Sequence, residues 1–381
     1  MTLEQKRIPY RIEKINMRCY GDKPASFTRM QPSGAIPVAI IDGVTYNQSN
    51  DIMYALEEQF PNHEALVPTD QNLRMKAQEL LRLERTLFSA WMYWLTSRDS
   101  PNGELRANFI SVLNEVEDAL SATKGGFFLG NEVSIVDMMF TPFLERIAAS
   151  MLYFKGFQIR VAPGEKTAFP AVNKWFDAME TLESYQLTKS DYYTHCWDLP
   201  PQLGGCVSES GSEQFQDAIN GKVDGSWHYP LTPNNGGLEP DWNFCGFEDD
   251  NAAKREAVER ISANSEAIVG FASRGAGNEG FPKYGAQLSD PNAVSNEMIQ
   301  PFVDASLKIV ATKLLDGQNC DEQMQDLVSI LKQDEGGELA KQVALSLAYL
   351  RDRIGVPRDM RLPAARQLRA TLNWAIDMCQ K

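Results

Sequence analysis

The residues whose types and spacing suggest chemistry lie in one short stretch, Gln31–Phe60, which reads QPSGAIPVAIIDGVTYNQSNDIMYALEEQF. If the Ile36–Pro37 peptide bond is cis, the turn leaves the backbone N–H and C=O of Ile36 free to pair with an extended, peptide-like ligand. Gln48 and Ser49 stand at an expected helix start, where free N–H groups and a hydroxyl suit a carboxylate. One bound molecule could use both places. Each feature alone has a plainer interpretation, because most X–Pro bonds are trans and most serines before helices are simple caps.

A hairpin and a helix are expected to position these groups. Val38–Ile41 is a short apolar run, Asp42–Gly43 is a dipeptide favoured in two-residue hairpin turns, and Val44–Tyr46 returns as a second strand. Apolar residues at helical spacing after Ser49 then predict an amphipathic helix. The stretch is therefore predicted to fold as strand, turn, strand and helix.

Within this stretch the order Pro-Ser-Gly-Ala-Ile-Pro-Val, Asp-Gly and Gln-Ser-x-x-Ile resembles the glutathione-binding half of the glutathione S-transferases, which has a thioredoxin-like fold. Upstream, the run from Ile8 to Phe27 looks like the omega, lambda and dehydroascorbate-reductase branch of that family. Downstream, Phe127–Ile147 is similar to the helix-6 region of the same branch. The resemblance covers roughly the first half of the chain.

The resemblance implies a binding site for glutathione as co-substrate. Lys23 would meet the glycine carboxylate, and Ile36, held by Pro37, would pair its backbone with the cysteinyl part. Gln48 and Ser49 would hold the γ-glutamyl end; many family members have Glu at the first of these two positions. The implied reactions are thiol transfer, reduction of dehydroascorbate or glutathione mixed disulfides, and conjugation. The second substrate would be a small electrophile or a disulfide, and a homodimer is common in the family.

The catalytic residue is unknown. In the family, a strand and a catalytic Cys or Ser precede the position of Leu3. Since that strand lies between the strand expected at Tyr10–Met17 and the hairpin, its loss would leave neighbouring strands unpaired. We therefore expect a chain truncated at its N-terminus, with a naturally noncatalytic relative as the alternative. Cys19 is not a convincing substitute for the catalytic residue.

Composition narrows the class of protein. The 381 residues are 43% hydrophobic and 23% charged, which is ordinary for globular domains, and the net charge of −14 argues against nucleic acid or an anionic membrane as a general partner. The six scattered cysteines and three histidines indicate neither a disulfide framework nor a metal site. No run is apolar enough for a membrane span, and no signal peptide is visible. The expected location is the cytoplasm, or an organelle such as a plastid if a transit peptide is missing.

The predicted fold class is α+β. A thioredoxin-like glutathione-binding domain, incomplete at its N-terminus, would occupy residues 1–65, and an all-helical transferase domain residues 70–190. A Gly-, Pro- and Asn-rich loop or linker would follow at 191–250, and a helical extension of unknown role at 251–381. In the helical domain, Ser134 and Asp137 are expected to form a capping box.

Two further patterns have competing interpretations. Trp91, Tyr93 and Trp94 could line an apolar substrate pocket, although such a stripe is more often core. Six arginines lie within nineteen residues, from Arg351 to Arg369, and suggest either docking of an acidic or phosphate-bearing partner or surface ion pairs with the protein's own carboxylates. We favour core packing and ion pairs. The alternative function is a noncatalytic transferase-fold scaffold or ligand-binding protein that works through its helical extension.

Overall fold

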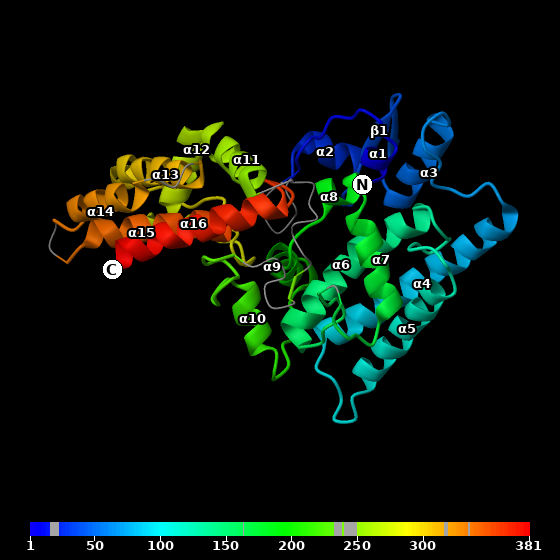
Figure 1. Ribbon diagram of the computed structural model, residues 1–381. Coiled ribbons are helices and arrows are strands. Elements are labelled where there is room, and N and C mark those ends of the chain that lie inside the picture. Colours follow the sequence, from blue (N-terminus) through cyan, green and yellow to red (C-terminus); the bar gives the residue numbers. More distant parts are fainter. Residues whose placement is uncertain (16–22, 163, 232–237, 240–249, 316–318, 334–335) are drawn as a thin grey trace. The chain divides into compact units, whose positions relative to one another are not determined.

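The computed structural model describes residues 1–15, 23–162, 164–231, 238–239, 250–315, 319–333 and 336–381. It divides the chain into two compact units. The N-terminal unit comprises Met1–Thr188 and Cys196–Ser212, and the C-terminal unit comprises Lys189–His195 and Glu213–Lys381. Figure 1 shows mainly helices and one small hairpin, so the predicted α+β class is confirmed.

The hairpin forms where the sequence predicts it. Strands β1 (Ala39–Ile41) and β2 (Val44–Tyr46) are antiparallel, with Ala39 opposite Tyr46 and Ile41 opposite Val44. Asp42 and Gly43 both have positive φ, 48° and 83° respectively, which is the backbone of a tight hairpin turn.

Short helices surround the hairpin in Figure 1: α1 (Thr2–Gln5), α2 (Ala25–Met30) and α3 (Ser49–Gln59). Ile8, Ile41 and Leu56 are buried together and form a small apolar core between the first segment, the hairpin and α3. This core packs α3 against the hairpin, so the helix whose start belongs to the candidate site has a fixed neighbour.

The strand expected at Tyr10–Met17 is not formed over residues 10–15, and the rest of that range lies outside the described residues. Tyr10 and Ile12 are 45% and 67% exposed. A strand is stabilised by hydrogen bonds to a neighbouring strand, and within the described residues the only ladder is the one between β1 and β2. The segment therefore runs irregularly at the surface.

The N-terminal unit contains the helices of the predicted all-helical transferase domain. The helices are α4 (Gln71–Thr96), α5 (Glu104–Ser121), α6 (Ile135–Lys155), α7 (Pro170–Glu180) and α8 (Glu183–Thr188). In α4, Trp91 and Trp94 are each 1% exposed, whereas Tyr93 is 65% exposed. The core interpretation thus holds for the two tryptophans, and Tyr93 points to solvent.

The start of α6 is organised by Asp137, as the capping-box motif predicts. Its Oδ2 accepts hydrogen bonds from the backbone N (2.9 Å) and Oγ (2.7 Å) of Ser134. Its Oδ1 accepts from the backbone N of Phe128 (3.1 Å) and from Nε1 of Trp175 in α7 (2.9 Å). Asp137 is fully buried, and burial raises its pKa while these four donors oppose the rise. One carboxylate therefore joins α6, α7 and the loop before α6.

Two helices lie within the range 191–250 that we predicted as a loop or linker. They are α9 (Tyr192–Leu203) and α10 (Glu213–Ile219). Pro200 and Pro201 made α9 hard to predict, because proline disfavours a helix interior. The residues around Glu209 return to the N-terminal unit: Oε1 of Glu209 accepts from Nε1 of Trp94 (2.8 Å) and Nζ of Lys155 (3.1 Å).

The C-terminal unit is a helical assembly with its own apolar core. Its larger helices are α11 (Asp250–Ser262), α12 (Ser265–Ala272), α13 (Gln300–Leu315), α14 (Cys320–Leu331), α15 (Glu338–Asp352) and α16 (Leu362–Gln380). Short 3-10 helices lie at Ser273–Ala276 and Glu297–Ile299. The sequence predicts one helix across α11 and α12, but it breaks at Asn264, whose backbone is not helical (φ −143°, ψ 50°). Asparagine is a weak helix former, and a polar break at this point is consistent with that.

The arginines from Arg351 to Arg369 mostly pair with the protein's own carboxylates, as we favoured. The pairs are Arg351–Asp352, Arg353–Asp290, Arg358–Asp359, Arg361–Glu256 and Arg369–Asp191. The expectation that these are surface pairs is wrong for Arg369, which is 1% exposed, and Arg366 is equally buried. These two side chains are part of the interior of the C-terminal unit.

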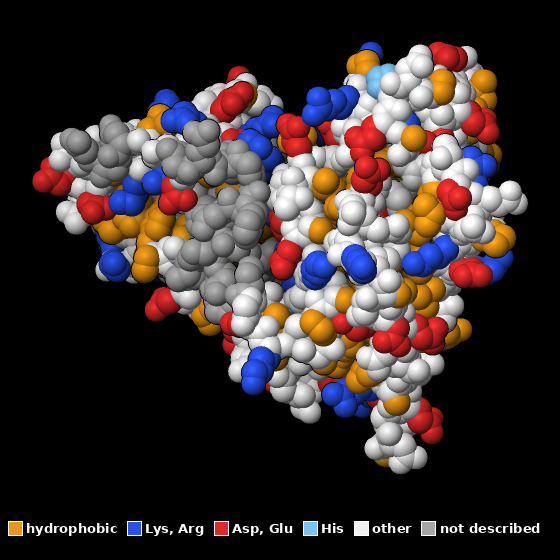
Figure 2. All heavy atoms as spheres, turned by 45° about the vertical axis from the view of Figure 1, so that its right-hand side comes forward, with side chains coloured by type: hydrophobic (Ala, Val, Ile, Leu, Met, Phe, Trp, Pro, Cys, Tyr) orange, Lys and Arg blue, Asp and Glu red, His pale blue; other side chains and the backbone are white. Residues whose placement is uncertain are grey.

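In the part of the chain that the structure describes, no helix is long and apolar enough to cross a membrane. On the face shown in Figure 2, acidic and basic side chains are interspersed over the described surface. The excess of negative charge is therefore spread out rather than gathered there in one acidic region.

Candidate functional site

Lys23 lies just before α2 and is half-buried. A Cβ atom on Gly34 would lie 3.4 Å from Cε and 3.6 Å from Cδ of Lys23, so the lysine stem passes directly over this glycine. Its Nζ lies 5.6 Å from the ring centroid of Phe27. Gly34 has φ +69°, a conformation that glycine adopts easily. The lysine is thus held against the turn that leads to Ile36.

The Ile36–Pro37 peptide bond is cis, as hypothesised from the sequence. Ile36 is 49% exposed and lies between the Gly34 turn and β1. Within the described residues, neither backbone polar group of Ile36 takes part in a hydrogen bond. An extended ligand could therefore pair with this residue as a neighbouring strand would.

Helix α3 begins at Ser49, and Gln48 is its N-cap with an extended backbone (φ −124°, ψ 136°). Among the described residues, no side chain forms a capping hydrogen bond there, and both Gln48 and Ser49 are exposed. The first N–H groups of a helix have no partner within it and carry partial positive charge, so this end can accept a carboxylate. Asp51 in the first turn already uses part of that favourable field.

The structure joins the two ends of the predicted site through one residue that the sequence reasoning missed. Gln31 ends α2, begins the Gly34 turn, and donates from Nε2 to the backbone O of Asn47 (3.5 Å), which directly precedes Gln48. Gln31 is only 5% exposed, which is unusual for a glutamine. The sequence did not reveal this residue, because its burial is visible only in the structure. Lys23, Ile36, Gln48 and Ser49 thus belong to one continuous arrangement within the N-terminal unit.

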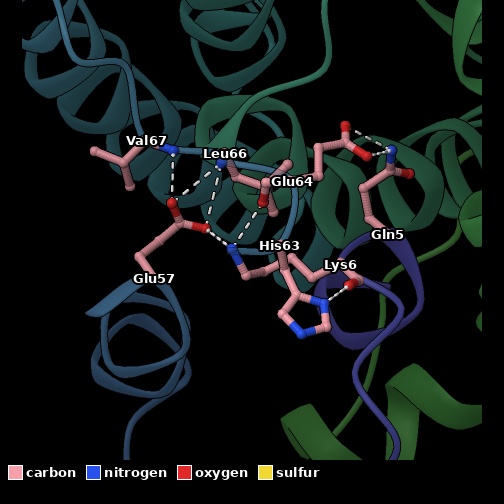
Figure 3. A network of polar contacts seen from close by, with 7 residues as sticks. All are labelled: Gln5, Lys6, Glu57, His63, Glu64, Leu66 and Val67. Carbon is pink, nitrogen blue, oxygen red and sulfur yellow. Dashed lines mark hydrogen bonds and ion pairs between the residues drawn. The ribbon is translucent and has the colours of Figure 1, made fainter. Parts of the chain in front are cut away.

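A polar network fixes the other end of α3, as Figure 3 shows. Nζ of Lys6 donates to Oε1 of Glu57 (2.7 Å) and to the backbone O of Glu64 (2.7 Å). The Glu57 carboxylate also accepts from the backbone N atoms of Leu66 (3.1 Å) and Val67 (3.3 Å). Lys6 is only 2% exposed, so these two acceptors replace the hydrogen bonds that water would otherwise make with its ammonium group.

His63 and Gln5 complete this network. Nδ1 of His63 lies 2.7 Å from the backbone O of Lys6, and since a carbonyl oxygen only accepts, Nδ1 carries the proton. Nε2 of Gln5 donates to both carboxylate oxygens of Glu64, at 2.9 and 3.0 Å. The network ties α1 to α3 and to the loop after α3. It has the character of a structural anchor for the helix whose other end is the candidate site.

The described cysteines do not resemble activated nucleophiles. Cys196, Cys320 and Cys379 are buried, and Cys206 is half-buried. Burial raises the pKa of Cys206 to about 12 and that of Cys379 to about 11, whereas a nucleophilic cysteine needs a lowered pKa. Cys19 lies outside the described residues.

Cys206 gives a direct test of this conclusion. A thiol with a pKa near 12 is almost fully protonated at pH 8, so we expect its alkylation by iodoacetamide to be roughly a hundred-fold or more slower than that of free cysteine. The rate should rise about ten-fold per pH unit through pH 10, as followed by mass spectrometry of the Cys206 peptide. Alkylation at pH 8 as fast as that of free cysteine would contradict the raised pKa.

Comparison with known proteins identifies the family of the first half of the chain. The family model for the glutathione S-transferase N-terminal domain matches residues 1–59, and the model for the glutathione S-transferase C-terminal domain matches residues 81–178. The first match contains every predicted site residue from Lys23 to Ser49. The second contains α5 and α6 and most of α4 and α7.

Curated relatives are similar over the same region. The chain is 26% identical over 190 residues to a protein named glutathione S-transferase DHAR2 of Arabidopsis thaliana, which covers 50% of this chain and 80% of the relative. It is 28% identical over 191 residues to a probable cytosolic glutathione S-transferase DHAR1 of Oryza sativa, with the same two coverages. A chloroplastic relative of Arabidopsis thaliana, DHAR3, is 22% identical over 191 residues and is covered to 66%.

Two solved structures are also similar to parts of the chain. Glutathione transferase Omega 3C from Trametes versicolor matches with a TM-score of 0.42 and 24% identity over 48% of this chain and 75% of its own. Leishmania TDR1, titled a trimeric glutathione transferase, matches with a TM-score of 0.48 and 16% identity over 92% of this chain and 82% of its own. The two family models carry the assignment: residues 1–59 and 81–178 belong to the glutathione S-transferase family as its N-terminal and C-terminal domains, and over this region the chain is similar to the glutathione S-transferases named DHAR.

Proposed function

We propose that the N-terminal unit binds glutathione at Lys23, Ile36, Pro37, Gln48 and Ser49 and acts in glutathione-dependent transferase chemistry. The observation that carries the proposal is the start of α3, which is exposed and is capped by no side chain of the described residues. Family membership supports the choice of ligand.

The chemistry of glutathione suits the three places. The ligand has a carboxylate at each end and an extended peptide-like centre. Lys23 offers a cation for the glycine carboxylate, and the first N–H groups of α3, with the Ser49 hydroxyl, suit the γ-glutamyl carboxylate. Ile36 offers a backbone N–H and C=O that form no hydrogen bond within the described residues. Each carboxylate of the ligand would thus meet a cation or hydrogen-bond donors, and its peptide groups would meet the N–H and C=O of Ile36.

For the reaction itself, we propose that the sulfur of glutathione is the nucleophile. In conjugation the sulfur would form a carbon–sulfur bond as the leaving group of a small electrophile departs, and in thiol transfer it would attack one sulfur of a disulfide and expel the other as a thiolate. In dehydroascorbate reduction, two glutathione molecules would supply the two electrons and be oxidised to glutathione disulfide. The described protein thiols are poor alternatives, because burial raises the pKa of Cys206 and Cys379. Dehydroascorbate, a glutathione mixed disulfide and a chloronitrobenzene are the three substrates with which the reaction type is to be assayed.

Replacing the ligand-facing groups should weaken binding without unfolding the protein. We expect Lys23→Ala to raise the Kd for glutathione roughly ten-fold or more, because a charge-assisted hydrogen bond is lost. Ser49→Ala, which keeps the backbone N–H groups, should raise it by about three- to ten-fold. Isothermal titration calorimetry measures both.

Lys76→Ala is the matched control, since Lys76 is a lysine of the same unit, in α4, and is half-buried as Lys23 is. It should leave the Kd unchanged. The proposal is overturned if the folded wild-type protein binds no glutathione, or if Lys76→Ala weakens binding as much as Lys23→Ala does. If the protein binds glutathione and turns over none of the three substrates, the noncatalytic ligand-binding alternative replaces the enzymatic one.

A further inference from the structure

Gln31 is a buried polar residue that connects three segments around the proposed glutathione site. Its backbone N donates to the O of Phe27 in α2 (2.8 Å), and its backbone O accepts from the N of Gly34 (2.9 Å). Its side chain reaches across sixteen residues of sequence to the backbone O of Asn47 (3.5 Å). At 5% exposure, this carboxamide has almost no contact with water.

The three segments carry different parts of the site. Phe27 and Gly34 are the residues over which the side chain of Lys23 lies. Ile36 follows two residues after Gly34. Asn47, by contrast, belongs to the segment between β2 and α3, directly before Gln48 and Ser49. The Gln31 side chain is therefore a bridge between the lysine side of the site and the helix side.

We propose that Gln31 is a positioning residue, which sets the distance between the Lys23–Ile36 side and the Gln48–Ser49 side so that one glutathione molecule fits both. This inference rests on the proposed function. Gln31 itself touches no ligand in this scheme; it acts through the backbone of Asn47.

The physical reason is that a ligand with two anchored ends is sensitive to the spacing of its anchors. When both sides are held in place, the second contact is made intramolecularly and at little further entropic cost. When the hydrogen bond from Gln31 to Asn47 is removed, the two sides can shift independently. Each binding event must then fix their spacing again, at a cost in conformational entropy. A ligand that touches one side alone does not experience this loss.

The experiment compares two ligands in two glutamine variants. Gln31→Met keeps the length and volume of the side chain but removes the hydrogen bond. Gln59→Met is the matched control, because Gln59 is exposed, lies at the opposite end of α3 and donates to the Tyr46 hydroxyl (3.1 Å). Glutathione touches both sides of the site, whereas the dipeptide cysteinylglycine can reach only the Lys23–Ile36 side. Both are titrated, with NMR chemical shifts as the readout, up to millimolar Kd values.

We expect Gln31→Met to raise the Kd for glutathione at least about five-fold and the Kd for cysteinylglycine less than about two-fold. Gln59→Met should change neither. An equal loss for both ligands would reduce Gln31 to a general structural residue and overturn the inference, as would unchanged glutathione binding by Gln31→Met. No binding of cysteinylglycine to the wild type also overturns it, since the lysine side would then not be a site. If the wild type does not bind glutathione, the proposed function itself is wrong.

Discussion

Replacing Asp137 by alanine is expected to lower the free energy of unfolding of the N-terminal unit by about 3 to 5 kcal/mol, among the largest effects of any single substitution in the chain. The carboxylate is fully buried and accepts four hydrogen bonds, from Ser134 (two), Phe128 and Trp175. Its removal leaves the backbone N–H of Phe128 and the indole N–H of Trp175 without this acceptor in the interior, which costs far more than the loss of a surface bond.

The measurement is urea unfolding followed by tryptophan fluorescence and circular dichroism. Asp137→Asn keeps the size and one acceptor oxygen but turns an amide N–H₂ toward donors, so we expect a fall of about 2 to 3 kcal/mol. Asp118→Asn, at an exposed position of α5, is the control and should change stability by less than about 0.5 kcal/mol. A loss below about 1 kcal/mol for Asp137→Ala would show that this carboxylate does not organise α6 and α7.

The second large effect is expected in the C-terminal unit, at the ion pair between Asp191 and Arg369. Both side chains are 1% exposed. Arg369 also donates from Nη2 to the backbone O of Ile354 (2.6 Å), and its guanidinium lies 4.7 Å from the ring centroid of Trp227. Asp191→Ala should destabilise this unit by about 3 to 5 kcal/mol, because it removes the carboxylate that is paired directly with a buried arginine.

A double substitution separates the unpaired charge from lost packing. Removing both partners, in Asp191→Ala with Arg369→Met, should restore at least part of the stability lost in Asp191→Ala, since no charge is then left unpaired. Asp326→Asn, at an exposed position of α14, is the control. The double variant could instead be less stable than Asp191→Ala by the full cost of a second core substitution. In that case the unpaired buried charge is not the main cause of the stability lost in Asp191→Ala.

The hairpin and α3 could be predicted from the sequence because local patterns determine them. A two-residue turn with two positive φ angles requires residues such as Asp42 and Gly43, and the apolar spacing after Ser49 is that of a helix. The capping box at Ser134 and Asp137 is also a local motif, and it was found for the same reason.

The features that were missed depend on contacts distant in sequence. The bridge from Gln31 to Asn47 and the network around Lys6 join segments 16 and about 50 residues apart, and nothing in their local sequence marks them. Arg369 was expected at the surface because arginine usually lies there, but a carboxylate 178 residues earlier in the chain stabilises it inside. The strand expected at Tyr10–Met17 was wrong over residues 10–15, since strand formation depends on a partner that the local sequence cannot supply.

The course of the chain between residues 189 and 212 determines how the protein can be divided experimentally. Lys189–His195, which includes Asp191, packs with the C-terminal unit, whereas Cys196–Ser212, which includes Glu209, packs with the N-terminal unit. A break after residue 188 would take from the N-terminal unit the acceptor of Trp94 and Lys155. A break after residue 212 would take from the C-terminal unit the counter-charge of Arg369. The two halves are therefore interlaced in sequence, and no single cut yields two intact pieces. The helical extension is for this reason not a detachable appendage, and expression of either half alone requires a segment borrowed from the other.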